Sequence, residues 1–192
     1  MHEVVDRQEI FLACSALLAY PSHPAFLSML EKIIEMGIPE LAETAKGLLV
    51  LDALEREVHY VNLFDFQEKT SLFLTAHEFG DDREQGPALL VIKEKIEQSG
   101  CLIPDAQLPD YLPLLLEWLA SHDDEEIEHR VGQMAHFLLQ AFDHDEVYRP
   151  LLSLLAHQCK MKDKFISPKQ ENPDLEELPY PCDYASKEVF RC

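Results

Sequence analysis

The chain has 192 residues, of which 47% are hydrophobic and 27% are charged. This length and composition are typical of a single globular domain that buries about 70% of its unfolded surface. Asp and Glu number 36 against 16 Lys and Arg, which gives a net charge of −20. A charge of this sign repels DNA, RNA and anionic lipid and attracts a basic peptide. The acidity also keeps a protein soluble, and that role alone can account for it.

The first ten residues and the cysteines favour a cytoplasmic protein. The start, MHEVVDRQEI, is acidic where a secretory signal is basic. No segment reaches the ~18 apolar residues that span a bilayer. The five cysteines, at 14, 101, 159, 182 and 192, are odd in number and form no CxxC pair. This usage favours free thiols in a reducing compartment over a disulfide scaffold.

Apolar residues recur at helical spacing along most of the chain, and breakers rich in Pro and Gly separate the stripes. In chain order, the stripes are Ile10, Cys14, Leu17 and Leu18; Phe26, Met29, Leu30, Ile33 and Ile34; Leu51, Leu54, Val58 and Val61; and Leu112, Leu115, Leu116 and Leu119. We find no alternation with a period of two and no internal repeat. The pattern therefore predicts an all-α protein, a single-domain bundle of roughly eight to ten helices.

The helical pattern fades towards the C-terminal end of the sequence. Residues 1–160 are expected to form the helical domain, and residues 161–192 an extended or partly ordered tail. This tail contains prolines 168, 173, 179 and 181 and many charges, which disfavour a packed core. A tail that packs across the domain is the alternative.

Two helix starts carry chemical markers. Ser121 precedes three acidic residues at 123–125, which predicts a capping side chain followed by an acidic first turn that suits the helix dipole. Asp143 with Glu146 resembles a capping box, although Pro150 allows the helix to begin only from there.

Two enzymatic interpretations are weaker than a binding function. His122, Glu125 and His129 recur along one helix, but seven residues separate the two histidines by ~10.5 Å, which is too far for one shared metal ion. The chain has no GxSxG, GxxxxGK[ST] or GxGxxG motif. A metal-dependent phosphohydrolase of the HD type is the remaining catalytic alternative. Its candidate residues are His77, His122, Asp123 and Asp143.

The first of two dense blocks covers residues 60–86. Tyr60 and Phe64 are one helical turn apart, beside the Val58/Val61 part of the third stripe, which we expect to be buried. Asp65 is expected to end this helix, and Thr70 or Ser71 can cap the next one.

The second block covers residues 107–120. Pro109 and Pro113 flank Asp110 and stiffen the first turn of a helix. Tyr111 and Trp118, with the leucine between them at 114, form a face separate from the leucine stripe. A helix that is apolar on two faces is either fully buried or keeps one face for a partner.

These blocks carry a resemblance to a known family. The first contains Y-V-x-x-F-D (60–65), S-L (71–72) and H-x-x-G-D-x-R (77–83), and the second contains L-P-D-Y-L-P-L-x-L-E (108–117). Together they resemble the NarJ-type nitrate reductase molybdenum cofactor assembly chaperones, relatives of the TorD and DmsD maturation chaperones. The match covers about a third of the chain. It departs from the family at Gln107, where Glu is frequent, and at Gln85, where Arg is expected.

The resemblance implies an all-helical fold of the TorD-like type and a cytoplasmic chaperone without catalytic activity or a cofactor of its own. Its expected partner is the N-terminal, twin-arginine-like segment of the apo catalytic subunit of a nitrate reductase. The chaperone would assist insertion of the molybdenum cofactor before the enzyme docks at the membrane. Proteins of molybdenum cofactor biosynthesis are further candidate partners. A sulfoxide or N-oxide reductase is the alternative client.

We expect a set of residues from the two blocks to face or shape the site for the partner peptide. The apolar members would anchor the peptide, and the three carboxylates would meet its positive charge. The set is Tyr60, Phe64, Asp65, His77, Pro109, Asp110, Tyr111, Glu117 and Trp118.

Overall fold

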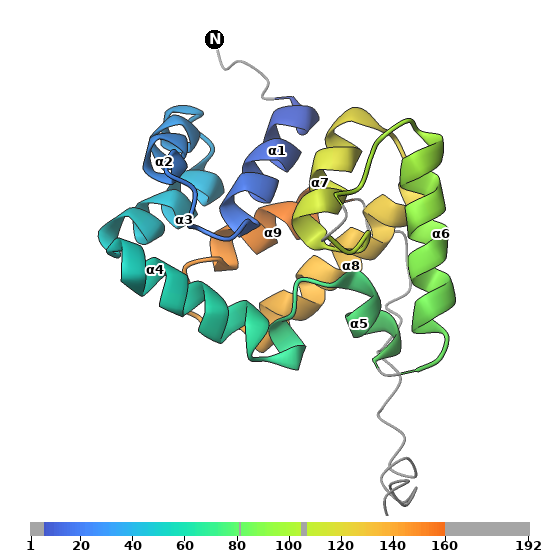
Figure 1. Ribbon diagram of the computed structural model, residues 1–192. Helices are drawn as coiled ribbons and strands as arrows, with labels where there is room; N and C mark the ends of the chain where they lie inside the picture. Colours follow the sequence, from blue (N-terminus) through green and yellow to red (C-terminus); the bar gives the residue numbers. More distant parts are fainter. Residues whose placement is uncertain (1–5, 81, 105–106, 160–192) are drawn as a thin grey trace, which may run out of the picture.

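The computed structural model describes residues 6–80, 82–104 and 107–159, and within these ranges the chain forms nine α-helices and no β-strand. The predicted all-α fold is therefore confirmed (Figure 1). The predicted tail at 161–192 lies outside the described residues. The α-helices are α1 (Arg7–Leu18), α2 (Phe26–Glu35), α3 (Pro39–Val50), α4 (Ala53–Tyr60), α5 (Leu74–Phe79), α6 (Gln85–Gln98), α7 (Leu112–Ser121), α8 (Glu125–Ala141) and α9 (Arg149–Gln158).

The core lies between α1 and its neighbours α7, α3 and α9. Figure 1 shows α1 in dark blue at the centre, with α7 beside it and α9 behind. Both sequence stripes that flank this contact are buried along their whole length, as predicted. Apolar residues of α1 and α7 thus leave water together, at roughly 25 cal/mol for each Å² removed. The buried members are Ile10, Cys14, Leu17 and Leu18 of α1 and Leu112, Leu115, Leu116 and Leu119 of α7.

Helix α4 contradicts the sequence prediction. Leu54 and Val58 are 69% and 50% exposed, so the stripe that they form is not buried. The helix instead buries Arg56 and Tyr60. The Arg56 guanidinium donates to the backbone carbonyls of Leu48 and Leu51 at the end of α3, which have no helical partners of their own. Hydrophobic pattern alone could not reveal that a charged side chain would find backbone acceptors inside.

The caps of α8 and α9 also differ from the prediction. Ser121 is the last residue of α7, and Asp124 caps α8 by accepting hydrogen bonds from the amides of Glu126 (3.1 Å) and Ile127 (2.9 Å). Asp143 caps no helix, because α9 begins only at Arg149, with proline 150 in its first turn. Pro150 indicated the start of α9 better than Asp143 did, because the first turn of a helix is where the missing N–H of proline costs no hydrogen bond.

Asp124 is also joined to Lys95 of α6 by an ion pair at 2.8 Å. Burial acts to raise the pKa of the Asp124 carboxyl, but hydrogen bonds from Lys95 and from the amides of Ile127 and Glu126 outweigh it and hold the pKa below its ordinary value. The carboxylate therefore contributes stability above an unfolded pKa of ~3.9, and this contribution is lost as the pH falls through the lower folded value.

We predict that Asp124→Ala lowers the free energy of unfolding by about 1–2 kcal/mol at neutral pH, because α8 loses its cap and Lys95 loses its partner. Urea denaturation followed by circular dichroism measures the loss, and it should shrink below about pH 4. Asp6→Ala is the matched control, because Asp6 precedes α1 without a side-chain cap. An equal loss in the control would contradict this account.

Helices α8 and α9 approach closely at Gly132. A Cβ atom built on Gly132 would lie 2.8 Å from the Cβ of Cys159 and 3.1 Å from its carbonyl oxygen. Such separations are shorter than van der Waals contact. Only glycine at position 132 therefore lets Cys159, which follows α9, pack this closely against α8.

We predict that Gly132→Ala destabilises the protein by about 1–3 kcal/mol through overpacking. Gly86→Ala in α6 is the control, because a Cβ there meets no atom within 4 Å. Replacing a helical glycine should leave stability unchanged or raise it by up to about 1 kcal/mol. Thermal unfolding of both variants checks the prediction, and a stable Gly132→Ala protein would refute it.

Candidate functional site

The two sequence blocks are joined in space at the starts of α5 and α7. Phe73 and Tyr111 form an isolated antiparallel bridge. Beside it, the amide of Leu74 donates to the carbonyl of Asp110 at 3.0 Å, and the amide of Leu112 donates to the carbonyl of Leu72 at 2.8 Å. These backbone bonds fix the order and spacing of side chains from segments that are far apart in the sequence.

The Asp110 side chain caps α5 from this second segment. Asp110 is 1% exposed, and its Oδ2 accepts hydrogen bonds from the amide (3.0 Å) and the hydroxyl (2.6 Å) of Thr75. The residue at the N-cap position of α5 is Phe73, which supplies no side-chain cap. The prediction that Thr70 or Ser71 caps this helix was therefore wrong, because both residues lie before that position. The carboxylate offsets the positive end of the α5 dipole.

An aromatic cleft opens beside this junction, with a volume of about 230 Å³. The hydroxyls of Tyr60 and Tyr111 are hydrogen-bonded at 2.9 Å, and the Tyr60 hydroxyl also donates to the carbonyl of Leu18. Ring centroids lie 4.9 Å apart for Tyr60 and Phe64 and 5.4 Å apart for Tyr20 and Tyr60. The lining residues are Tyr20, Tyr60, Phe64, Asp65, Leu72, Phe73 and Tyr111.

A π-helical turn, η1 (Val61–Asp65), places Phe64 and Asp65 in this cleft. The turn is closed by a hydrogen bond from the amide of Phe66 to the carbonyl of Val61 at 3.1 Å. It continues directly from α4 and ends at Asp65, where the sequence predicted the helix to end. Single π turns inside helices occur frequently at functional sites.

The floor of the aromatic cleft is neutral and its rim is negative. Burial, and then the neighbouring tyrosine, raises the pKa of the Tyr60 hydroxyl, and burial also raises the pKa of the Tyr111 hydroxyl. Both hydroxyls therefore stay protonated at neutral pH. Asp65 is the carboxylate of the lining set, and it is exposed. The cleft is smaller than the ~300 Å³ at which small-molecule sites begin, so it suits an apolar side chain with a positive neighbour.

The structure brings four of the nine predicted site residues into the aromatic cleft: Tyr60, Phe64, Asp65 and Tyr111. Sequence reasoning missed Tyr20, Leu72 and Phe73 as lining residues. Leu72 and Phe73 stood inside the first block, and Leu72 within the S-L pair of the motif, but neither was proposed as a site residue. Tyr20 gave one weak signal, an aromatic residue directly before the breaker at 21–24.

The other predicted residues lie outside the cleft. The His77 ring contacts Phe137, its Nε2 lies 2.6 Å from the Ser71 carbonyl, and burial lowers its pKa. Trp118 is buried and donates from Nε1 to the Ser99 hydroxyl at 2.9 Å. Glu117 accepts from the Ser15 hydroxyl at 3.1 Å. Pro109 is buried next to Asp110.

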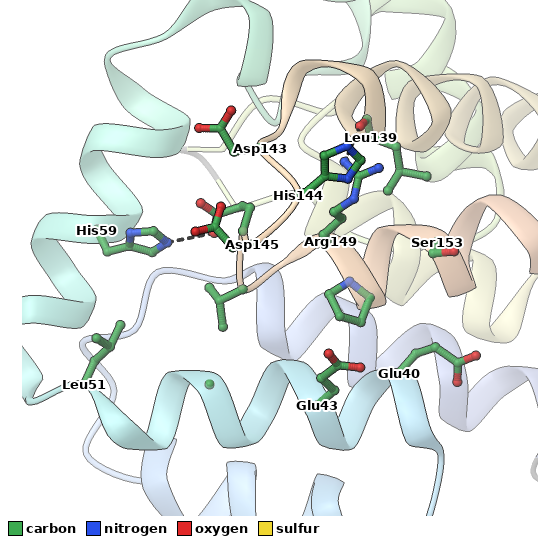
Figure 2. A pocket seen from close by; sticks show the side chains of 14 residues that line it. Glu40, Glu43, Leu51, His59, Leu139, Asp143, His144, Asp145, Arg149 and Ser153 are labelled. Carbon is green, nitrogen blue, oxygen red and sulfur yellow. Dashed lines mark hydrogen bonds and ion pairs between the residues drawn. The ribbon is translucent and has the colours of Figure 1, made fainter.

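A larger recess, the acidic groove, lies between α3, α4 and the segment that joins α8 to α9 (Figure 2). Its volume is about 880 Å³, and carboxylates are prominent among the side chains around it. The sequence had offered Asp143 only as a cap or as a phosphohydrolase residue. The lining residues are Glu40, Glu43, Gly47, Leu51, His59, Leu139, Asp143, His144, Asp145, Glu146, Val147, Arg149, Pro150 and Ser153.

The candidate catalytic residues are dispersed in the part of the chain that the structure describes. No group of three or more His, Cys, Asp or Glu side chains there could hold a metal ion. His122 is stacked on Trp118, Asp123 pairs with Arg7, and Asp143 lines the acidic groove. Within the same residues, no helix has both the length and the apolar character to span a bilayer.

Comparisons with known proteins point to one family. No protein-family model matches the chain. A Bacillus subtilis protein assigned as a nitrate reductase molybdenum cofactor assembly chaperone, NarJ, is 34% identical over 164 residues, covering 78% of this chain and 88% of that protein. The Escherichia coli nitrate reductase molybdenum cofactor assembly chaperone NarJ is 34% identical over 93 residues, which cover 48% of this chain and 39% of that protein.

The fold agrees with that of a solved structure. A protein from Archaeoglobus fulgidus, assigned as a redox enzyme maturation protein, superimposes with a TM-score of 0.60 over 82% of this chain and 98% of that one, at 19% identity. The predicted resemblance is thus confirmed by sequence relatives and by architecture. The chain belongs to the family of NarJ-type nitrate reductase molybdenum cofactor assembly chaperones.

Proposed function

We propose that this protein is a cytoplasmic chaperone that binds the N-terminal segment of the apo catalytic subunit of a nitrate reductase. By holding that segment it assists insertion of the molybdenum cofactor before the enzyme docks at the membrane. The chain catalyses no reaction of its own in this proposal. The observation that carries it is the aromatic cleft, because five residues from both blocks of the family motif line it together: Tyr60, Phe64, Asp65, Leu72 and Tyr111.

Binding is proposed to combine one apolar anchor with one charge contact. An apolar side chain of the client segment enters between Phe73, Tyr111 and Phe64, and a Lys or Arg beside it meets Asp65. The net charge of −20 speeds the encounter with a basic segment. Since the charge term is exposed and screened by salt, affinity stays moderate and release remains feasible.

The cofactor itself is proposed to be held by the client. At about 230 Å³ the aromatic cleft is below the range of pockets that enclose even a drug-sized ligand, and a molybdopterin dinucleotide is larger still. In this proposal the aromatic cleft acts on the polypeptide of the client and not on its cofactor.

Calorimetric titration with a synthetic peptide tests the proposal. The peptide is the N-terminal segment of the host's nitrate reductase catalytic subunit, and the titration is run at low and at moderate salt. Saturable binding that weakens as salt rises is expected. Absence of binding at both salts, with folded protein, would reject the nitrate reductase client, and the equivalent sulfoxide or N-oxide reductase peptide would then be titrated.

In the same titration we predict that Phe73→Ala weakens binding about tenfold, because the cleft loses an aromatic wall. Asp65→Asn should weaken it about two- to fivefold and flatten its salt dependence, since an exposed charge contact contributes less. Phe66→Ala and Glu94→Gln are the matched controls, being exposed residues of the same kinds outside the cleft. If the controls weaken binding as much, the cleft is not the site.

Asp110 is predicted to act as a positioning residue. Asp110→Ala should increase hydrogen exchange of the α5 amides and reduce affinity for the client peptide, because the α5 cap is lost. Asp110→Asn should keep both the α5 protection and the peptide affinity close to those of the unchanged protein, since an amide oxygen still accepts hydrogen bonds from Thr75. An Asp110→Asn protein with normal α5 protection but no peptide binding would instead assign Asp110 a direct charge contact.

A further inference from the structure

The acidic groove contains carboxylates that the described part of the protein leaves without an ion pair or side-chain hydrogen bond. They come from α3 (Glu40, Glu43) and from the segment after α8 (Asp143, Asp145), and Figure 2 shows them around one recess. The guanidinium of Arg149 also lines the recess and keeps its positive charge, since its Nη1 donates to the neutral backbone carbonyls of residues 139 and 142. The carboxylates that line the recess outnumber this guanidinium, so the recess is negative.

The groove also has apolar walls. Leu51, Val147 and Pro150 line it together with the acidic residues. Leu54 and Val58 stand one turn apart on the exposed face of α4, the helix that also contributes His59 to the groove. We call Leu54 and Val58 the apolar ridge. An exposed apolar ridge on a helix that lines a negative recess complements a segment with one apolar and one basic face.

Like charges that face one recess repel each other, and a concave surface concentrates their field. A flat acidic face would only raise solubility, whereas these carboxylates border an open recess of about 880 Å³ that is partly apolar. DNA, RNA and anionic lipid are repelled by it. A second copy of the chain is disfavoured as well, since each copy carries −20.

The groove and the aromatic cleft are distinct sites on two sides of α4. His59 faces the groove and Tyr60 faces the cleft, and consecutive helical residues point about 100° apart. The buried ring of Tyr148 fills the space between them, stacked on His59 with centroids 6.1 Å apart and edge-on to Phe64 at 5.0 Å. The groove and the cleft have no lining residue in common.

We propose that the acidic groove and the apolar ridge bind a cationic amphipathic segment of a partner protein, at a site separate from the aromatic cleft. Lysine or arginine side chains enter the groove and pair with the four carboxylates, while apolar side chains lie on Leu54 and Val58. His59, which is paired with Glu146 at 2.8 Å, forms the border between the two parts.

Fluorescence anisotropy with the full chain tests this site. The probe is a labelled synthetic helical peptide of about 14 residues, ~21 Å long, with lysine on one face and leucine on the other. The groove variant combines Glu40→Gln, Glu43→Gln, Asp143→Asn and Asp145→Asn. The matched control combines Glu9→Gln, Glu31→Gln, Glu35→Gln and Glu94→Gln, which are exposed carboxylates with the same change in net charge. Circular dichroism verifies that both fold.

The groove variant should bind the probe on the order of tenfold more weakly at low salt, and the control less than about twofold. Leu54→Ser with Val58→Ser should also weaken binding, whereas Phe73→Ala in the aromatic cleft should leave it unchanged. Equal losses in the groove variant and the control would show a general attraction to the acidic surface and overturn the proposal. Absence of saturable probe binding, or weaker probe binding in Phe73→Ala, would also overturn the proposal of a second site. This result does not depend on whether the client peptide binds in the calorimetric titration.

Discussion

The hydrogen bonds between the Asp110 carboxylate and Thr75 hold the functional region together. They supply the cap that the start of α5 lacks locally, and the flanking backbone bonds join the α5 and α7 segments in one register. Because backbone and side chain act at the same place, the positions of Phe73 and Tyr111 follow from the capping geometry. The walls of the aromatic cleft are thus set by a buried contact between α5 and the segment before α7.

Burial in this protein follows hydrogen-bond satisfaction as much as apolar pattern. The stripes of α1 and α7 were predictable because Leu and Cys side chains have no competing polar demand. Helix α4 was not, since its Arg56 finds carbonyl acceptors at the end of α3 that exist only in the folded chain. The same limit explains the caps: Asp124 could have been chosen over Ser121 only by knowing where α7 ends.

About half of the candidate site could be predicted from sequence. Tyr60, Phe64, Asp65 and Tyr111 were identified because the family motif marks them, and they converge in the cleft. Asp110 belongs to the same motif but serves the interior, since a motif records which residues are needed and not which way they face. The acidic groove was not predicted, because its carboxylates come from α3 and from the segment between α8 and α9, and only the fold brings them together.

The π-helical turn after α4 has a consequence for the rotational phase of this region. A residue four positions on in an α-helix lies just past a full turn of 3.6 residues, so a row at that spacing gradually winds away from its starting line. The wider turn η1 follows directly after Tyr60, whose ring centroid lies 4.9 Å from that of Phe64. Because a π turn holds more residues than an α turn, it changes the direction in which the residues after it point. The direction in which Asp65 leaves the helix, towards the aromatic cleft, therefore depends on the number of residues in this one turn.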